Sequence, residues 1–493
     1  MADAREHCLN DQKTFNAKIR SNVLLKKTQW LALLMGLFFL PGVASAADID
    51  GANLSLAWGV PFAGVLLSIA VMPLLVPNVW HHHFGKITAG WALAFLLPFA
   101  FYFGIHAAWV NFIHALLAEY MPFVILLTAL YVVAGGIYIR GSLRGTPVLN
   151  TAILAIGAVL ASFMGTTGAS MLLIRPIIRA NAQRSSMTHV VVFFIFIVSN
   201  AGGSLTPLGD PPLFLGFLKG VPFTWTFQHI WPDTLFLVVV LLGLFFVWDT
   251  WAYRREPAQP AKVEAAEHER LGFDGKFNFV LLAAVVALVL MSGIWQSPVV
   301  FDIAGTEVGL PGLLRDLGLV VVAVISLATT SHRVHTANQF GWDPMFEVAK
   351  LFAGIFLTII PVIAMLKAGT EGPFGPIVRA VTNPDGSPNP AMYFWATGVL
   401  SSFLDNAPTY LVFFNTAGGD VLQLTTEMAT TLAAISAGAV FMGANTYIGN
   451  APNMMVKAIA EDRGVRMPSF FGYMLWSVGI LIPLFVVMTF MFF

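Results

Sequence analysis

The chain contains a series of apolar runs whose lengths approach or exceed what a helix needs to cross a lipid bilayer. A transmembrane helix takes about 20 predominantly apolar residues. Ten runs are of this kind, at 54–77, 88–105, 121–139, 189–220, 232–252, 278–296, 316–330, 348–367, 427–460 and 472–493. Hydrophobic residues make up 57% of the 493 residues and charged residues 11%, so lipid must solvate much of the surface. The sequence therefore predicts an all-α polytopic membrane protein with about ten transmembrane helices.

The first 46 residues have the features of a secretory signal peptide. Lys26 and Lys27 precede an apolar run at 30–40, and the small residues Ala44-Ser45-Ala46 form a cleavage site. The alternative is an uncleaved first helix, and both interpretations place Asp48 on the outer side of the membrane. We expect segment 1–46 to be the signal peptide of a multi-pass protein of a bacterial inner membrane.

Two further apolar stretches, 150–181 and 391–418, are interrupted at their midpoints. Basic residues flank the first stretch on both sides, whereas acidic residues flank the second. Because Lys and Arg gather on the cytoplasmic side, each stretch should enter and leave the membrane from one face, and the two should use opposite faces. We therefore expect two re-entrant hairpins of opposite orientation. The flanking residues are Arg140, Arg144, Arg175, Arg179 and Arg184 for the first, and Asp385, Asp420 and Glu427 for the second.

A shift of 240 residues, without a gap, aligns the two halves of the chain. The opposite charge flanks and the matches at this single shift predict two inverted repeats, a common plan of secondary transporters. The first half is 47–253, the second is 277–493, and the polar stretch 254–276 is a cytoplasmic linker between them. The shift places Ser162 on Ser402, Gly203 on Gly443, Thr206 on Thr446, Gly209 on Gly449, Asp210 on Asn450 and Pro212 on Pro452.

Each half also contains an apolar helix that glycine and proline interrupt. The run 189–220 breaks at 201–212, and the run 427–460 breaks at 443–452. Such breaks free backbone amides and carbonyls inside the membrane, where an unsatisfied polar group costs several kcal/mol. The ends of the half-helices also carry partial charges that suit ions. The two breaks therefore predict a binding site for an ion or a substrate.

Side chains with oxygen atoms gather at the two breaks and at the hairpin tips. Hydroxyl, amide and carboxylate oxygens are the ligands that a small hard cation prefers. For any single Ser, Thr or Asn the alternative is a plain hydrogen bond between helices, so the hypothesis depends on their clustering. The first half supplies Ser199, Asn200, Ser204, Thr206 and Asp210, with Thr166 and Thr167 at the hairpin tip. The second half supplies Asn445, Thr446 and Asn450, with Asp405, Asn406 and Thr409 at the hairpin tip.

Asp405 and Asp210 are the two acidic members of this set. A carboxylate at membrane depth is a functional candidate, and it can hold a proton or a cation but not readily both. We interpret Asp405 as the shared proton and cation site and Asp210 as a second carboxylate. The alternative for each is the N-cap of the helix that follows.

Other charged residues near the membrane allow more than one interpretation. Lys367 ends an apolar run, where it is a possible counter-ion to Asp405 or a lysine that reaches to the surface. Arg175 and Arg179 are explained by the preference for basic residues on the cytoplasmic side. As an alternative, their hairpin arm would attract an anionic substrate.

Several function classes are excluded by what the sequence lacks. Net charge at pH 7 is zero, so there is no basic field for nucleic acid. The sequence has no Walker loop and no catalytic motif in a suitable context. We expect no enzymatic activity, no cofactor and no metal beyond a transported cation, with the lipid bilayer, a proton and a small inorganic cation as partners.

Four stretches at the hairpins and breaks resemble the ion transporter superfamily. They are Thr167-Gly-Ala-Ser-Met-Leu-Leu-Ile-Arg-Pro176, Ser199-Asn-Ala-Gly-Gly-Ser-Leu-Thr-Pro-Leu-Gly-Asp-Pro-Pro212, Leu404-Asp-Asn-Ala-Pro-Thr409 and Gly449-Asn-Ala-Pro-Asn453. This superfamily includes NhaD-type sodium/proton antiporters, arsenite permeases, citrate transporters and divalent-anion/sodium symporters. The resemblance covers most of the chain after residue 54. It implies two inverted repeats, each with a re-entrant hairpin and a broken helix, and a homodimer.

Within the superfamily, the tips resemble those of the antiporters more than those of the symporters. NhaD-type antiporters carry an Asp-Asn pair at a hairpin tip and a Gly-Asp turn in the broken helix, and Asp405-Asn406 and Gly209-Asp210 look like these. Dicarboxylate symporters carry Ser-Asn-Thr at each tip, which neither tip has here. An acid at the tip would also repel a carboxylate substrate. One departure is that the NhaD-type pattern has more acids around the first tip, where this chain has Thr166-Thr167, so cation choice and proton stoichiometry stay open.

The resemblance and the residues together give a functional hypothesis with two alternatives. The hypothesis is exchange of sodium or lithium for protons across the inner membrane. One alternative is a citrate, dicarboxylate or other anion transporter that is coupled to a cation gradient. The other is a membrane scaffold without transport activity, which would have no need of two broken helices.

Overall fold

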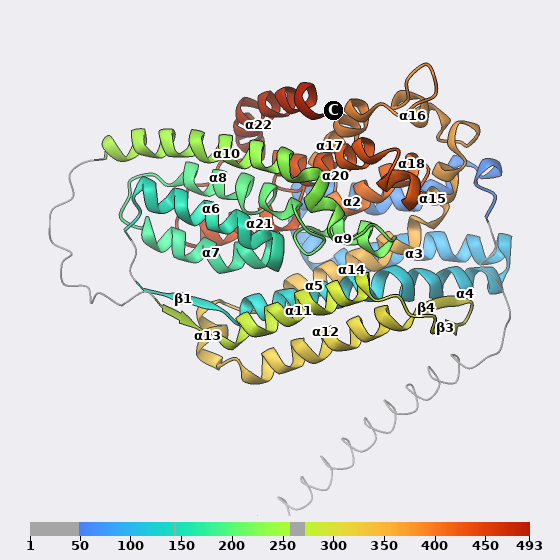
Figure 1. The fold of residues 1–493 in the computed structure, drawn as a ribbon, viewed down its shortest axis with the longest axis horizontal. Helices are drawn as coiled ribbons and strands as arrows, with labels where there is room; N and C mark the ends of the chain where they lie inside the picture. Colours follow the sequence, from blue (N-terminus) through green and yellow to red (C-terminus); the bar gives the residue numbers. More distant parts are fainter. Residues whose placement is uncertain (1–48, 142–143, 257–271) are drawn as a thin grey trace, which may run out of the picture.

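The computed structural model describes residues 49–141, 144–256 and 272–493. The predicted signal peptide and residues 257–271 of the predicted linker lie outside these ranges. Within the described residues the fold is helical apart from two short antiparallel ribbons (Figure 1). One ribbon pairs β1 (Tyr138–Arg140) with β2 (Gly272–Asp274), and the other pairs β3 (Val300–Ile303) with β4 (Thr306–Gly309). The prediction of an all-α polytopic membrane protein is confirmed.

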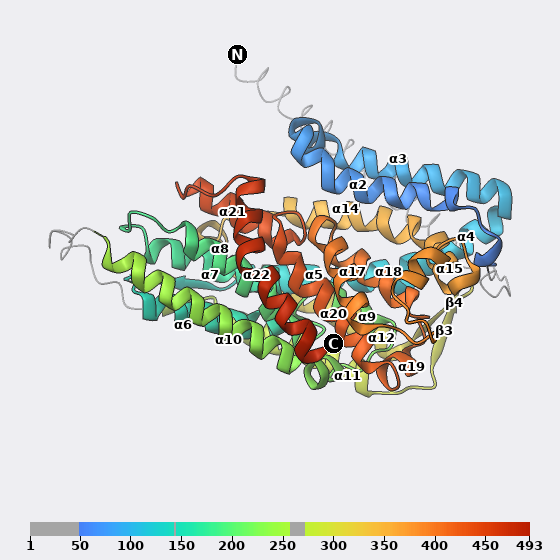
Figure 2. The same ribbon diagram turned by 90° about the horizontal axis from the view of Figure 1, so that it is seen from above.

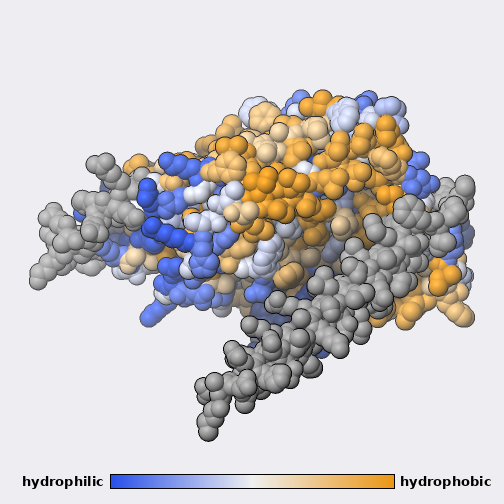
Figure 3. Space-filling view, turned by 90° about the horizontal axis from the view of Figure 1, so that it is seen from below, coloured by the Kyte–Doolittle hydropathy of each residue, from blue (hydrophilic) through white to orange (hydrophobic). Residues whose placement is uncertain are grey.

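Eight helices in the described part of the chain are long and apolar enough to span a bilayer, and a bent pair raises this number to nine. Their outer surfaces are strongly apolar: Phe101 is 93% exposed, Phe490 87% and Ile105 81%. Figure 3 shows hydrophobic residues across the middle of one face of the molecule, with hydrophilic residues gathered at one end of it. This distribution suits a protein whose middle is surrounded by lipid.

The first half begins with spans that pack side by side and ends with a long helix. After the short helices η1 (Gly51–Asn53) and η2 (Leu56–Gly59) come α2 (Val60–Leu75) and α3 (Pro77–Phe103). A third span is continuous from Ile105 to Gly135 and consists of α4 (Ile105–His114), the π-helical turn η3 (Ala115–Tyr120) and α5 (Met121–Gly135). The hairpin of α6 (Pro147–Met164) and α7 (Thr166–Ala180) follows. The broken helix consists of α8 (Thr188–Ile197), η4 (Ala201–Ser204) and α9 (Pro211–Leu218), and α10 (Trp225–Arg254) completes the half.

The second half repeats this order. The spans are α11 (Phe277–Ile294), α12 (Leu310–Thr329) and the bent pair α14 (Asp343–Thr358) and α15 (Ile360–Lys367), with α13 (His332–Ala337) before the pair. After η5 (Gly369–Glu371) and α16 (Gly375–Ala380) comes the hairpin of α17 (Pro390–Phe403) and α18 (Asn406–Thr416). Then follow α19 (Val421–Thr425), the broken helix of α20 (Ala429–Met442), η6 (Gly443–Asn445) and α21 (Ala451–Asp462), and α22 (Phe470–Phe492). Figures 1 and 2 show the two hairpins and the two broken helices packed together with the spans in one bundle.

Several expected spans are shorter than the helices in the structure, and two of them begin much later than the helix does. The run expected to begin at residue 88 belongs to α3, which begins at Pro77, and the run expected to begin at 121 belongs to a span that begins at Ile105. Hydropathy misses the added turns of α3 because they carry His81, His82 and His83, which are exposed. A helix satisfies its own backbone, so it continues through polar residues where these can reach water.

The 240-residue repeat reappears in helix boundaries and in hydrogen bonds. α7 begins at Thr166 and α18 at Asn406, while α9 begins at Pro211 and α21 at Ala451. In the first half the Thr206 hydroxyl donates to the carbonyl of Ser162, and in the second half the Thr446 hydroxyl donates to the carbonyl of Ser402. These hydroxyls tie each break to the first arm of the adjacent hairpin. The repeat therefore conserves the backbone frame around the site.

Candidate functional site: a buried carboxylate where two broken helices meet

The two broken helices meet through a set of asparagine side chains. The Asn450 amide nitrogen donates to the carbonyl of Ser199 and to Oδ1 of Asn200, both at 3.2 Å. The Asn200 amide nitrogen in turn donates to Oδ1 of Asn453 at 2.7 Å. Asn453 also donates to the carbonyls of Gly443 and Thr446, each at 2.9 Å. Amide groups can donate and accept at once, so they satisfy the backbone that the breaks expose.

Asp210 lies at the centre of this contact and is 2% exposed. Its carboxylate accepts hydrogen bonds from the Thr166 hydroxyl at 2.8 Å, from the Asn450 amide at 3.2 Å and from the Asn406 amide. Thr166 stands at the first hairpin tip, Asn406 at the second tip and Asn450 at the second break. Four elements from both halves therefore converge on one carboxylate. Among the described residues no Lys, Arg or His forms an ion pair with Asp210.

The local sequence explains why the Asp210 side chain is free to face this centre. Asp210 stands at the N-cap position of α9, but its side chain makes no capping hydrogen bond. Pro211 and Pro212 occupy the first two positions of that helix and have no N–H to donate. The next N–H, of Leu213, bonds to the backbone carbonyl of Asp210 at 3.1 Å. The alternative of a side-chain N-cap therefore does not describe Asp210.

Asp405 has a different environment. It is half-buried, and one of its carboxylate oxygens accepts from the backbone N–H of Ala407 at 3.2 Å, so it caps α18. The Thr409 hydroxyl donates to the backbone carbonyl of Asp405 at 3.0 Å. The chain neighbour of Asp405, Asn406, donates to the Asp210 carboxylate, so the second hairpin tip brings the two acids into one region. In the structure Asp405 is therefore the N-cap of α18, which was the alternative interpretation from the sequence.

Two amide oxygens in the same region are buried without a hydrogen-bond partner among the described residues. They are Oδ1 of Asn406 and Oδ1 of Asn445. The amide nitrogen of Asn406 is bonded to Asp210, and that of Asn445 donates to the Ser402 hydroxyl at 2.9 Å. An unsatisfied buried acceptor costs about 1–3 kcal/mol. Both oxygens are hard ligands of the kind that suit a small cation.

The remaining predicted side chains occupy supporting or separate positions. The Ser199 hydroxyl bonds to Ser170 at 2.9 Å, and Ser204 bonds to Thr234 at 2.5 Å. Thr206 and Thr446 bond to hairpin carbonyls, as described above. Thr167 is half-buried at the first tip.

Lys367 does not lie beside Asp405. It is exposed at the end of α15. A side chain at Gly419 would approach the Lys367 stem at 3.3 Å, and Gly419 follows the C-terminal end of α18, whereas Asp405 is at the N-terminal end. The counter-ion prediction for Lys367 is therefore not supported, and the alternative of a lysine that reaches the surface fits its exposure.

The sequence reasoning missed Asn453 and Ser170 as members of the site. Asn453 closes Gly449-Asn-Ala-Pro-Asn453 and holds both sides of the second break, as its bonds to Gly443 and Thr446 show. The position of Asn453 in that short motif could have identified it as a member of the site. Ser170 stands one turn after Thr166 on α7 and meets Ser199. Nothing local in the sequence indicates that contact, because the two residues are on different elements.

Comparison with known proteins places most of the chain in one family. Residues 51–493 match the family described as putative citrate transport. An uncharacterized transporter of Mycobacterium tuberculosis is 27% identical over 335 residues, which cover 65% of this chain and 71% of that protein. An uncharacterized transporter of Synechocystis is 21% identical over 332 residues, which cover 63% and 70%. A Na(+)/H(+) antiporter NhaB of Pseudomonas aeruginosa is 26% identical over 287 residues, which cover 56% and 53%.

These matches agree with the resemblance noted from the sequence motifs. Citrate-transport-like and sodium/proton antiporter relatives both appear, so the similarity to the ion transporter superfamily is confirmed. The family description and the names of these relatives refer to transport, which favours a transporter over a scaffold without transport activity. This chain belongs to the putative citrate transport family of membrane transporters.

Proposed function

We propose that this transporter exchanges sodium or lithium ions for protons across the bacterial inner membrane, with Asp210 as the shared site. The observation that carries the proposal is a carboxylate that is 2% exposed and that, within the described residues, is held by neutral donors alone. Hydrogen bonds stabilise such a charge but do not neutralise it, and a buried unpaired charge is costly. A proton or a small cation removes that cost, and the two compete for the same oxygens.

The neighbouring amides supply a means of switching between the two occupants. With a proton or no ion bound, the Asn406 and Asn450 nitrogens donate to Asp210. With a cation bound, rotation of an amide by half a turn presents Oδ1, an oxygen ligand, in place of the nitrogen. Asn406 Oδ1 is buried and has no hydrogen-bond partner among the described residues, so it is available as such a ligand. Asp405 acts in this proposal as a second carboxylate that attracts the cation.

The relatives support the proposal at the level of similarity only. One set of relatives carries the name Na(+)/H(+) antiporter. An acidic centre also disfavours a carboxylate substrate, because like charges repel. Energy would come from the proton or the sodium gradient.

Sodium-dependent proton flux in everted membrane vesicles tests the proposal. Asp210→Asn keeps the shape of the side chain but removes its charge, and we expect it to abolish the dissipation of a pH gradient when sodium is added, read by acridine orange fluorescence. Asp385→Asn, in an exposed loop, is the matched control and should behave as wild type. Wild-type exchange by Asp210→Asn in vesicles that contain the variant at normal levels would refute the assignment.

A second candidate function is transport of citrate, a dicarboxylate or another anion. The family description favours it, and so does Arg175 on α7, which is 6% exposed. Arg175 donates to Gln339 at 3.2 Å, while its Nε and Nη1 are buried without a partner among the described residues. A buried guanidinium with free donors suits a carboxylate. Uptake of labelled citrate into proteoliposomes, by wild type and by Arg175→Gln, separates this candidate from sodium/proton exchange.

A further inference from the structure

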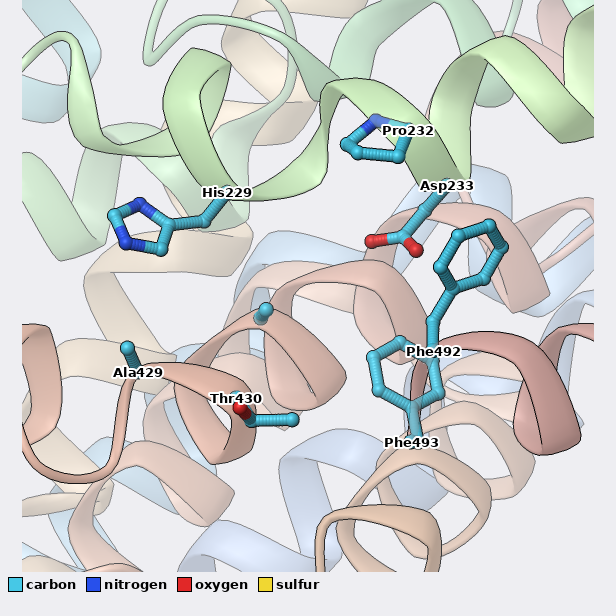
Figure 4. A pocket seen from close by; sticks show the side chains of 8 residues that line it. His229, Pro232, Asp233, Ala429, Thr430, Phe492 and Phe493 are labelled. Atoms are coloured by element: carbon cyan, nitrogen blue, oxygen red, sulfur yellow. The ribbon is translucent and has the colours of Figure 1, made fainter.

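A second acidic side chain faces a cavity at the edge of the bundle, away from the central site. Asp233 lies on α10 and is 2% exposed. A cavity of about 130 Å³ lies between α10, α20 and the C-terminal end of α22, and its lining includes Asp233, Thr430 and the rings of Phe492 and Phe493. Figure 4 shows the Asp233 carboxylate pointing into the space between the two helices, with Thr430 on the facing helix. His229 and Thr430 are exposed, so the cavity opens to the surface beside them.

The Asp233 carboxylate has no ion-pair or hydrogen-bond partner among the described residues. The polar side chains next to it on α10 are bonded elsewhere. His229 bonds through Nδ1 to the carbonyl of Trp225 at 2.9 Å. Thr234 bonds to Ser204 and to the carbonyl of Ile230. The sequence from 220 to 253 contains no Lys or Arg, and neither does the sequence from 380 to 456. A buried carboxylate without a fixed positive partner either takes up a proton or is stabilised as an anion by a mobile cation.

The equivalent position in the other repeat carries a polar group that is satisfied within the protein. The 240-residue shift places Tyr473 of α22 at the position of Asp233. Tyr473 is fully buried, and its hydroxyl donates to the carbonyl of Ala444 at 2.8 Å, so its polar group is satisfied within the protein. In the first repeat the residue at this position is charged, lacks a protein partner and faces a cavity. The repeat is therefore asymmetric here, as it is at Asp210 and Asn450.

The size of the cavity and the kind of oxygens around it indicate the ligand class. One water needs roughly 10–15 Å³ of such volume, so about 130 Å³ holds an ion together with several waters. One carboxylate and one threonine hydroxyl are hard oxygen ligands, too few for a fully dehydrated cation. We infer that Asp233 and Thr430 form a second site, separate from Asp210, that binds a partly hydrated sodium or lithium ion.

The position of this second site connects it to both breaks. Thr234, the next residue after Asp233, bonds to Ser204 of η4 at 2.5 Å. The facing wall belongs to α20, which leads into the second break at η6. An ion at Asp233 therefore binds against the two helices that frame the central site. The site lies at the end of α10 that is opposite to Arg254.

Binding of ²²Na⁺ to the purified full-length protein in detergent tests the inference without relying on transport. We compare wild type, Asp210→Asn, Asp233→Asn and the double variant in a scintillation proximity assay. The expected result is that Asp210→Asn keeps saturable ²²Na⁺ binding, and that adding Asp233→Asn removes it. Equal binding by Asp210→Asn and the double variant, or no binding by Asp210→Asn, would overturn the inference.

A milder variant guards against effects on folding. Thr430→Val removes one hydroxyl ligand from an exposed position. In the Asp210→Asn background we expect the apparent Kd for ²²Na⁺ to rise about fivefold, because one ligand contributes about as much free energy as one hydrogen bond. Thr426→Val is the control, because Thr426 is exposed and does not line the cavity. An unchanged Kd for Thr430→Val also counts against the site. If instead the flux proposal for Asp210 fails, Asp210→Asn vesicles exchange normally while the ²²Na⁺ result for Asp233 still stands.

Discussion

At the scale of single residues, the site depends on how each acid is placed and not on the number of acids. Asp210 and Asp405 both begin a helix. Two prolines after Asp210 remove the N–H groups that its side chain would cap, whereas Ala407 offers one to Asp405. The same position in two helices therefore gives a central carboxylate in one case and a capping carboxylate in the other.

A prediction at this scale concerns Asn406, which donates to Asp210 and has a buried free oxygen. Asn406→Ala removes a hydrogen bond to a charged group, worth about 1.5–3 kcal/mol, and one oxygen ligand. We expect the sodium concentration for half-maximal exchange to rise by about tenfold or more, measured in everted vesicles. Asn415→Ala is the control on the same helix, because the Asn415 side chain donates to the carbonyl of Leu411 and, among the described residues, does not bond to Asp210. Equal sodium dependence of the two variants would show that Asn406 is not a ligand.

At the scale of elements, the breaks are built on close backbone contacts that only glycine permits. A Cβ at Gly209 would lie 2.1 Å from the carbonyl oxygen of Gly203, and a Cβ at Gly449 would lie 2.6 Å from that of Gly443. These glycine pairs bring the two ends of each break together. The hairpin tip at Gly165 depends on glycine for another reason, a φ of +80°.

The contact between Gly203 and Gly209 gives a prediction about stability. Gly209→Ala must displace backbone rather than a flexible side chain, so we expect a cost of about 1–3 kcal/mol, a lower melting temperature in detergent and loss of exchange. Gly243→Ala on α10 is the control, because no atom lies within 4 Å of the added Cβ. A Gly209→Ala protein with the melting temperature and exchange of wild type would contradict the proposed role of the break.

At the scale of the whole molecule, neither half contains the site by itself. Asp210 and Thr166 come from the first half, while Asn406 and Asn450 come from the second. The asparagine contacts between the two breaks lock the halves together at the same place. Ion binding and the relative position of the halves are therefore linked, as alternating access requires.

Asn450→Ala tests this link. It removes three hydrogen bonds that cross between the halves, to Ser199, Asn200 and Asp210. We expect both a lower melting temperature and weaker sodium-dependent exchange, since a buried acceptor left unpaired costs about 1–3 kcal/mol. Thr446→Val, which breaks a contact within the second half, should lower stability with a smaller effect on sodium dependence. A larger effect of Thr446→Val than of Asn450→Ala on sodium dependence would argue against a site shared by the halves.

The sequence by itself determined the features that depend on nearby residues. Apolar runs of the right length specify spans, since the bilayer demands them, and Gly and Pro specify where a helix breaks, since they cannot continue it. Thus the interruptions in the middle of 150–181, at 201–212 and at 443–452, and the repeat that relates them, were predicted close to where the structure has them.

Only the tertiary structure decided which side chains meet. The partners of Asp210 are 44, 196 and 240 residues away along the chain, and no local pattern selects them. For that reason the shared role was predicted for Asp405, with Lys367 as a possible counter-ion, whereas the fold places Asp210 at the centre and Lys367 at the surface. The burial of a carboxylate and its hydrogen-bond partners depend on how the helices pack, and they determine which carboxylate is stabilised by a bound ion.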